Sequence, residues 1–413
     1  MHEKYLKVGK ILEENMQEHL LAFYHKIEES KKEAFLDQIL AIDFELIKSL
    51  YEIAQSETIE DNGDVTPIEV TNIANLSPSK KLEYEELGLS IMKNGEFAAV
   101  TMAGGQGTRL GYNGPKGMYD IGLPSHKSLF QIQCDRLLDV KNITGTIVPW
   151  YIMTSKENND ATIEFFKSNK YFGYPKDDIV FFIQGMLPML DSNGKIILDE
   201  IGRIKEGADG HGGIFAAMSK SGVRADMKKR GVLWLFVGGI DNVLVRNADP
   251  IFLGFTAQSG CIASGKSVIK NDPNEKAGVF CKKAGHPHVV EYTEISQEMA
   301  NMRGLNGEYV YGDLHILCNL FSIEVFDMIG ENGLPYHKAL KKTPYIDLNG
   351  NKIVPDKPNA YKFEAFIFDA FGCLKDMAIL RAEREKEFAP VKNKDGIDSP
   401  GTAKALYIAC EKE

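Results

Sequence analysis

Several features that mark other classes of protein are missing from this sequence of 413 residues. No stretch reaches about 18 uninterrupted apolar residues, so we expect no transmembrane helix and no membrane partner. The amino terminus is charged and lacks an apolar segment, which argues against a signal peptide. The six cysteines are widely spaced and form no CxxC pair. We therefore expect reduced core thiols in a cytoplasmic protein.

Extended basic tracts are missing as well. The formal net charge is −10, so we expect no nucleic-acid partner, and any positive charge that binds a ligand must be local. Hydrophobic residues make up 44% of the chain, which is enough to bury a sizeable core and to form more than one domain.

Helical periodicity dominates the first 94 residues, and from Phe97 onward apolar runs alternate with helical patterns. This alternation predicts an α/β fold with a doubly wound, mixed, mostly parallel sheet. We expect an N-terminal helical subdomain (1–94), a core (95–390) and a short C-terminal segment (391–413). The expected strands are 97–103, 146–153, 179–184 and 232–237, and the expected helices include 79–93, one that begins at Ser128, 160–168 and 214–220.

The most informative motif follows the first expected strand. It reads Ala-Gly-Gly-Gln-Gly-Thr-Arg-Leu-Gly (103–111) and is followed by Pro115-Lys116. Glycines at the end of a buried strand leave backbone N–H groups free and let a ligand approach closely. Arg109 and Lys116 add positive charge, so the segment predicts a nucleoside triphosphate site. The alternative is a plain glycine-rich turn with two surface cations.

A second segment, residues 260–267, matches the P-loop pattern GxxxxGK[ST] and ends in Gly265-Lys266-Ser267. A P-loop requires a strand before it and a helix after it. Here Asp249-Pro250 indicates the start of a helix before the motif, and 261–269 resembles a strand that leads into a turn. We therefore interpret this match as accidental.

The glycine-rich motif, together with Pro-Lys-Gly-Met-Tyr-Asp-Ile-Gly-Leu-Pro-Ser (115–125), resembles the signature of UDP-N-acetylhexosamine pyrophosphorylases. These belong to the UTP:sugar-1-phosphate uridylyltransferases, which have a Rossmann-like, GT-A-like sheet. The resemblance runs from about Leu82 to Ala405. Longer relatives continue into a further C-terminal domain, whereas this sequence ends at Glu413; the substrate groups are retained, so we expect catalysis to survive.

The resemblance implies roles for individual residues. Gly104 and Gly105 would lie against the uridine, with Gln184, Gly210 and His211 completing the base site. The phosphates would be held by Arg109, Lys116, Lys362 and Lys392. Sugar recognition would come from Gly278, Glu291, Asn319, Phe366 and Phe368.

Three of these assignments carry alternatives. His211 could be a structural loop residue instead of part of the base site. Asp241 follows the expected strand 232–237 and is the expected Mg²⁺ ligand, although it could instead cap a helix. Phe366 and Phe368 would share one face if their segment is a strand, and would line the space for an acetamido methyl; otherwise they are core residues.

The expected reaction is Mg²⁺-dependent transfer of uridylyl from UTP to N-acetylglucosamine 1-phosphate, giving UDP-GlcNAc and pyrophosphate. His211 stands where N-acetyl-sugar enzymes commonly carry Asn, which leaves open a glucose 1-phosphate or broad-range enzyme. A non-catalytic UDP-sugar-binding protein is a remoter alternative. We expect a monomer or weak homodimer.

Overall fold

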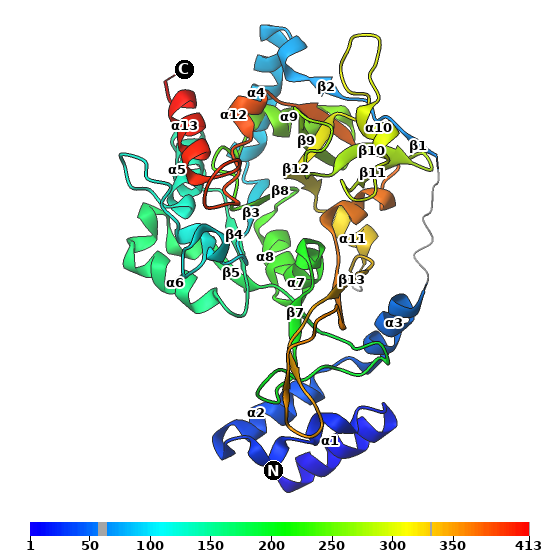
Figure 1. Ribbon diagram of the computed structural model, residues 1–413. Helices are drawn as coiled ribbons and strands as arrows, with labels where there is room; N and C mark the ends of the chain where they lie inside the picture. Colours follow the sequence, from blue (N-terminus) through cyan, green and yellow to red (C-terminus); the bar gives the residue numbers. More distant parts are fainter. Residues whose placement is uncertain (57–63, 331–332, 413) are drawn as a thin grey trace. The chain divides into compact units, whose positions relative to one another are not determined.

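The computed structural model describes residues 1–56, 64–330 and 333–412 (Figure 1). Its internal contacts form two compact units. The first unit comprises Met1–Asp61, Gly185–Gly213 and Pro335–Phe366, and the second comprises Asn62–Gln184, Ile214–Leu334 and Ile367–Glu413. These limits differ from the expected segments 1–94, 95–390 and 391–413. The reason is long-range pairing, because α4 (Pro78–Lys93) packs on α9 (Pro250–Ser259) of the second unit.

In the first unit, α1 (His2–Glu14), α2 (Glu29–Leu40) and α3 (Phe44–Gln55) provide half of the buried side chains of an apolar core, which the chain between α1 and α2 and the later stretches complete. Between α1 and α2 the chain forms two short 3-10 turns, η1 (Glu18–Leu21) and η2 (Tyr24–Lys26). Three antiparallel strand pairs make up the remainder: β6 (Met186–Pro188) with β7 (Glu206–Ala208), β13 (His337–Lys341) with β16 (Ala360–Glu364), and β14 (Tyr345–Ile346) with β15 (Lys352–Ile353).

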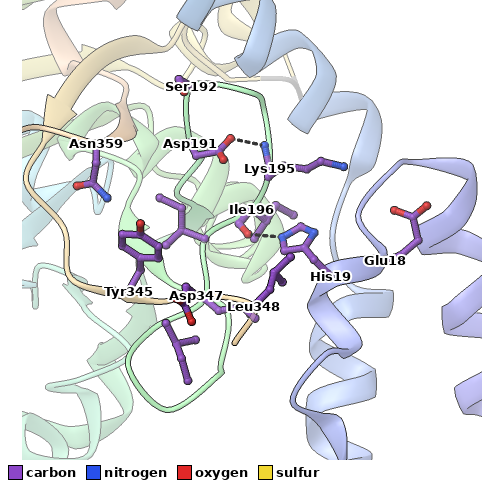
Figure 2. A pocket seen from close by; sticks show the side chains of 13 residues that line it. Glu18, His19, Asp191, Ser192, Lys195, Ile196, Tyr345, Asp347, Leu348 and Asn359 are labelled. Carbon is purple, nitrogen blue, oxygen red and sulfur yellow. Dashed lines mark hydrogen bonds between the residues drawn. The ribbon is translucent and has the colours of Figure 1, made fainter. Parts of the chain in front are cut away.

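A cavity of about 580 Å³ opens in the first unit (Figure 2). It is lined by Glu18 and His19 of η1 and by residues 191–192, 195–198, 345–348 and 359. The His19 Nε2 atom lies 2.7 Å from the Ile196 carbonyl oxygen. None of the predicted site residues in the described part of the chain lines this cavity.

The second unit is built on a mixed sheet with the strand order β2-β17-β9-β12-β8-β3-β4-β5. Along this path only β12 runs antiparallel to its neighbours. The strands are β2 (Thr71–Asn72), β3 (Phe97–Met102), β4 (Trp150–Thr154), β5 (Ile179–Ile183), β8 (Trp234–Gly239), β9 (Ala263–Ile269), β12 (Asp313–Ser322) and β17 (Ala378–Arg381), with β1 (Val65–Thr66), β10 (Val279–Lys283) and β11 (His286–Val290) joined to one side.

Helices connect the parallel strands, as the doubly wound prediction requires. α5 (Leu129–Thr144) joins β3 to β4, and α6 (Asn159–Ser168) joins β4 to β5. The remaining helices are α7 (Ile214–Lys220), α8 (Val223–Arg230), α10 (Gln297–Asn301), α11 (Val325–Ile329), α12 (Arg384–Glu387) and α13 (Pro400–Cys410). The predicted fold class and the predicted strands and helices are confirmed, with shifts of a few residues at their ends.

Two helix starts follow directly from local sequence. The Ser128 side chain accepts a hydrogen bond from the backbone N–H of Gln131 at the start of α5. Asp249 caps α9 in the same way, with Pro250 in its first turn. No helix within the described ranges is long and apolar enough to cross a membrane.

The strand order defines where a ligand can enter. From β3 the chain moves to β4 and β5 on one side, whereas β8 pairs with the other side of β3 (Figure 1). The order therefore reverses between β3 and β8, and the carboxyl ends of these parallel strands lie at one edge. The glycine-rich motif and Asp241 both follow these ends.

Candidate active site

The glycine-rich loop (residues 103–116) is folded back on itself directly after β3. The Gly107 N–H donates to the Gly114 carbonyl (2.9 Å), and the Lys116 N–H donates to the Gly105 carbonyl (3.0 Å). Buried Asn158 holds the start of the loop, since its side-chain amide donates to the Ala103 carbonyl (2.9 Å). The loop is thus fixed in shape before any ligand binds.

Two cations project from this loop into a setting free of counter-charge. Arg109 is exposed and Lys116 is half-buried. Among the described residues, no carboxylate lies within 4.0 Å of either charge, although ion pairs are frequent elsewhere in the chain. Two cations without a carboxylate partner at the end of a strand favour the binding of an anion.

Gly104 is brought against Gln184, which follows β5. A Cβ added at Gly104 would lie only 2.9 Å from the Gln184 Oε1 atom, so this glycine allows the close approach. The Gln184 backbone N–H donates to the Thr154 carbonyl at 2.8 Å, which anchors the residue to the end of β4. The structure therefore places together two of the residues predicted to bind the nucleotide. Gly105, by contrast, faces open space.

Asp241 lies two residues beyond the end of β8 and does not cap a helix. The next helix, α9, is capped by Asp249, so the alternative role for Asp241 is ruled out. The Asp241 carbonyl accepts a hydrogen bond from the Val391 N–H (2.8 Å). Asn242 ties the same turn to the end of α12 and the chain after it, since its side chain donates to the Glu387 carbonyl (2.7 Å) and accepts from the Ala389 N–H (2.9 Å).

A single carboxylate suits a magnesium ion that is shared with a substrate. Among the described residues, no group of three or more His, Cys, Asp or Glu is arranged to hold a metal. Mg²⁺ commonly takes only one or two protein carboxylates and completes its shell with water and substrate phosphates. The Asp241 side chain, at the ligand edge of the sheet, fits this pattern.

A buried polar network fixes the strand ends on both sides of the switch point. The Trp150 indole N–H donates to the Thr101 hydroxyl (2.9 Å), which donates to the Gln133 side-chain oxygen (2.7 Å). The Gln133 amide in turn donates to the Gly239 carbonyl (3.2 Å). Because these groups are buried and mutually satisfied, they make the edge that carries Asp241 rigid.

The P-loop match is a strand, as expected. Residues 263–269 form β9, and Lys266 is fully buried. Its ammonium lies 2.5 Å from Asp249 Oδ2 and 2.7 Å from Glu387 Oε1. Burial alone would lower the pKa of Lys266, but the two carboxylates more than compensate and raise it. Lys266 is therefore held within the protein and is not available to a nucleotide.

The predicted sugar residues Gly278 and Glu291 are neighbours. A Cβ at Gly278 would lie 3.2 Å from Glu291 Oε1. Burial, reinforced by the charges of Glu294 and Asp369, raises the pKa of the Glu291 carboxyl. Asn319 is completely buried in β12, opposite Val237 of β8.

Lys392 lies on the chain after α12. Its backbone N–H donates to the Asp398 carbonyl (2.7 Å), and its ammonium lies 5.7 Å from the centre of the Phe388 ring. Burial raises the pKa of the Asp398 carboxyl, while the charge of Lys392 acts in the opposite direction.

Four of the predicted residues belong to the first unit. Gly210 has φ +85°, and a Cβ there would lie 2.3 Å from the Ala365 carbonyl oxygen, so the turn at 209–213 requires glycine. The rings of His211 and Phe366 are 5.5 Å apart. The Lys362 ammonium lies 2.7 Å from Glu364 Oε1, so a phosphate would have to compete with this carboxylate for it.

The shared-face argument for Phe366 and Phe368 does not hold. β16 ends at Glu364, and Ile367–Cys373 forms a 3-10 helix, so the alternation of a strand does not apply. The two rings also belong to different units. Phe368 is buried, and its ring lies 6.0 Å from that of His315.

The cysteines also differ in part from expectation. Cys134, Cys281 and Cys318 are buried thiols, and burial raises the pKa of each. Cys373 is exposed, and the other two are half-buried. The prediction of core thiols is therefore wrong for half of them.

Comparison with known proteins places this site in a family. The protein-family model described as UTP–glucose-1-phosphate uridylyltransferase matches residues 48–398 of this chain. The chain belongs to this family. It is 36% identical to the UDP-N-acetylhexosamine pyrophosphorylase-like protein 1 of Homo sapiens, over 95% of this chain and 82% of that protein. It is 37% identical to the UDP-N-acetylglucosamine pyrophosphorylase of Saccharomyces cerevisiae, over 95% of this chain and 84% of that protein.

A solved structure extends the similarity to the fold. The uridine diphosphate N-acetylglucosamine pyrophosphorylase from Trypanosoma brucei, crystallised with an inhibitor, superposes with a TM-score of 0.82 at 29% identity. The match covers 99% of this chain and 85% of that chain.

Sequence reasoning missed the residues that support the site. Asn158 and Asn242 hold the glycine-rich loop and the Asp241 turn. Asn158 belongs to no recognisable motif, and Asn242 directly follows Asp241 in the Ile-Asp-Asn stretch but was given no role of its own. One signal was present: each follows the end of a parallel strand, where buried polar side chains often serve a ligand site.

Proposed function

We propose that this protein transfers uridylyl from UTP to N-acetyl-α-D-glucosamine 1-phosphate, releasing pyrophosphate. The observation that carries the proposal is the arrangement at the switch point. There, a preformed glycine-rich loop presents Arg109 and Lys116 without counter-charge, and Asp241 follows the neighbouring strand. Family membership and the names of the relatives at 36–37% identity support the same reaction.

The chemistry is an in-line displacement at phosphorus. An oxygen of the sugar phosphate forms a bond to the α-phosphorus of UTP, and the bond from that phosphorus to the bridging oxygen breaks, so that pyrophosphate leaves with the electron pair. Such reactions depend on positioning and charge stabilisation more than on covalent steps by the protein.

Each cation has a place in this displacement. Lys116 would contact the α-phosphate, and Arg109 would hold the departing β- and γ-phosphates, whose negative charge grows as the bond breaks. Lys392 and Lys362 would provide the remaining phosphate contacts, the latter by exchanging Glu364 for phosphate. Asp241 would hold Mg²⁺, which when bound neutralises phosphate charge.

Substrate recognition would involve the other predicted residues. Gln184 can both donate to and accept from the uracil edge, and its contact with Gly104 supports this role. Gly105 would face the nucleotide from the loop, with Gly210 and His211 completing the base site. Gly278, Glu291 and Asn319 would contact the sugar, and Phe366 and Phe368 would lie near its acetamido group. We further propose a cytoplasmic monomer or weak homodimer.

A panel of sugar phosphates tests the proposal. Pyrophosphate release from UTP and Mg²⁺ is measured side by side with N-acetylglucosamine, N-acetylgalactosamine and glucose 1-phosphates. A clear preference for an N-acetylated sugar is expected. A preference for glucose 1-phosphate would contradict the sugar assignment and favour the glucose enzyme. Release with none of the three would leave a UDP-sugar-binding protein.

A further inference from the structure

A bulge interrupts the centre of β12, beside the predicted sugar residue Asn319. Pairing with β9 shifts register between His315 and Asn319. Leu317, between them, has φ +54°, which is a strained conformation for a residue with a branched side chain. Strained backbone of this kind persists only where the surrounding structure enforces it, and it clusters at functional sites.

The bulge brings together two side chains that a regular strand would separate. Residues four apart on a strand lie roughly 13 Å from each other, because each residue advances the chain by about 3.3 Å. Here His315 Nε2 lies 3.0 Å from the Asn319 side-chain oxygen. A ring N–H must donate to that amide oxygen, since an oxygen of this type can only accept.

This bond decides which way the Asn319 amide faces. Its oxygen is occupied by His315, so its NH₂ group must point elsewhere. The Asn319 Nδ2 atom is buried and has no hydrogen-bond partner in the described structure. A buried donor without a partner is unfavourable, and an acceptor atom on a ligand would satisfy it.

The His315 ring is itself held in place. It meets the rings of Phe280 and Phe371 edge to face, at 5.1 and 5.8 Å between centres. The His315 backbone N–H donates to the Gly278 carbonyl (2.9 Å), and Gly278 in turn lies against Glu291. His315 therefore lies among the residues assigned to the sugar.

We propose that His315 is a positioning residue that fixes the Asn319 amide with its NH₂ group toward the sugar phosphate. The site then selects a sugar with an acceptor oxygen, from a hydroxyl or an acetamido carbonyl, at that position. This inference rests on the proposed function, because it takes Asn319 to contact the sugar. His315 need not touch the substrate itself.

The test separates the hydrogen bond from the packing of the ring. His315→Phe keeps an aromatic ring against Phe280 and Phe371 but removes the donor, so the Asn319 amide can rotate. We expect KM for the sugar phosphate to rise roughly tenfold, the effect of one lost hydrogen bond, with KM for UTP unchanged. His315→Gln retains an N–H donor and is expected to restore most of the affinity.

Two outcomes would overturn the proposal. One is an unchanged sugar KM in His315→Phe, and the other is an equal rise in the Phe and Gln variants, which would mean that ring shape alone matters. In an Asn319→Ala background, His315→Phe should have no further effect, so additive losses would also contradict it. Thermal unfolding of each variant confirms that it folds.

The proposed function and this inference fail in different ways. If the wild-type protein releases no pyrophosphate, the proposed function fails. The role of His315 is then tested by calorimetry, which gives the dissociation constant of UDP-N-acetylglucosamine. We expect His315→Phe to bind this ligand about tenfold more weakly and His315→Gln to recover most of the affinity. Equal affinities for all three proteins would refute it.

Discussion

Replacing Lys266 with methionine tests the packing of the second unit in the place where the sequence is most misleading. The Lys266 ammonium is fully buried between Asp249, which caps α9, and Glu387 of α12. Methionine has a similar length but no charge, so the variant leaves two carboxylates without their cation. Arg246 remains 3.6 Å from Glu387 and acts on Asp249 only through its charge at longer range, which leaves Asp249 as the less compensated of the two carboxylates.

The magnitude follows from this geometry. Removing one partner of a buried ion pair destabilises a protein by about 3–5 kcal/mol. Because Arg246 compensates part of the charge on Glu387, we expect a loss near the lower limit. By the usual scaling, about 3 kcal/mol lowers Tm by roughly 6–12 °C in a domain of 150–250 residues, and by less in a larger one. Urea and thermal unfolding measure the loss.

The pH dependence has a definite sign. Burial would raise the pKa of Asp249, but Lys266 and Arg246 hold it below its ordinary value in the wild type. In the wild type, the ionised Asp249 carboxylate therefore stabilises the folded state at pH values above about 3.9, the pKa of an unfolded aspartate. This stabilisation is lost as the pH falls through the lower pKa of Asp249 in the folded protein. In the variant, burial raises that pKa, so the folded state gains a proton as pH falls. The unfolding free energy of Lys266→Met should therefore fall below that of the wild type by less at pH 5.5 than at pH 8.

Two controls accompany the Lys266 variant. Lys229→Met removes an exposed charge from α8 and should change stability by less than about 0.5 kcal/mol. Adding Asp249→Asn and Glu387→Gln to Lys266→Met removes the unpaired charges and keeps a capping side chain, so stability should partly return. If Lys266→Met is as stable as Lys229→Met, the claim that Lys266 compensates the buried charges of Asp249 and Glu387 is wrong. Loss of an ATPase activity from a folded variant would revive the P-loop interpretation.

Three further predictions concern the site. Lys116→Ala should lower kcat for pyrophosphate release by a factor of roughly 10²–10³ with Tm unchanged, because the variant lacks a charge that stabilises the transition state. Near-normal turnover would contradict the contact of Lys116 with the α-phosphate. Asp241→Asn should sharply weaken the dependence of rate on Mg²⁺ in a metal titration, and an unchanged titration would rule it out as a ligand. Gly104→Ala places a Cβ 2.9 Å from Gln184 Oε1, so KM for UTP should rise severalfold while Tm is retained, whereas an unaltered KM would contradict a uracil contact.

The parts of the fold that the sequence predicts are local. An apolar run ended by glycine is enough to predict β3 and the loop after it, and Ser128 and Asp249 identify two helix starts because each caps its own helix. The alternation of strands and helices gives the parallel sheet. The P-loop match could be rejected from its flanking residues alone.

The parts that could not be predicted depend on contacts between distant residues. Lys266 and Glu387 are 121 positions apart, and Gln133 and Gly239 are 106 apart. The first unit is assembled from three separate stretches for the same reason. Leu317 gives no local sign of a positive φ, since leucine disfavours it, so the bulge that orients Asn319 is visible only in three dimensions.

Exchange of labelled pyrophosphate into UTP tests the central claim most directly. The purified protein is incubated with UDP-N-acetylglucosamine, Mg²⁺ and radiolabelled pyrophosphate, beside Lys116→Ala. The account predicts labelled UTP and free N-acetylglucosamine 1-phosphate in equal amounts from the wild type, and a large loss of both in the variant. Absence of labelled UTP from the wild type, or equal labelling by both proteins, would contradict a uridylyltransferase site at the glycine-rich loop.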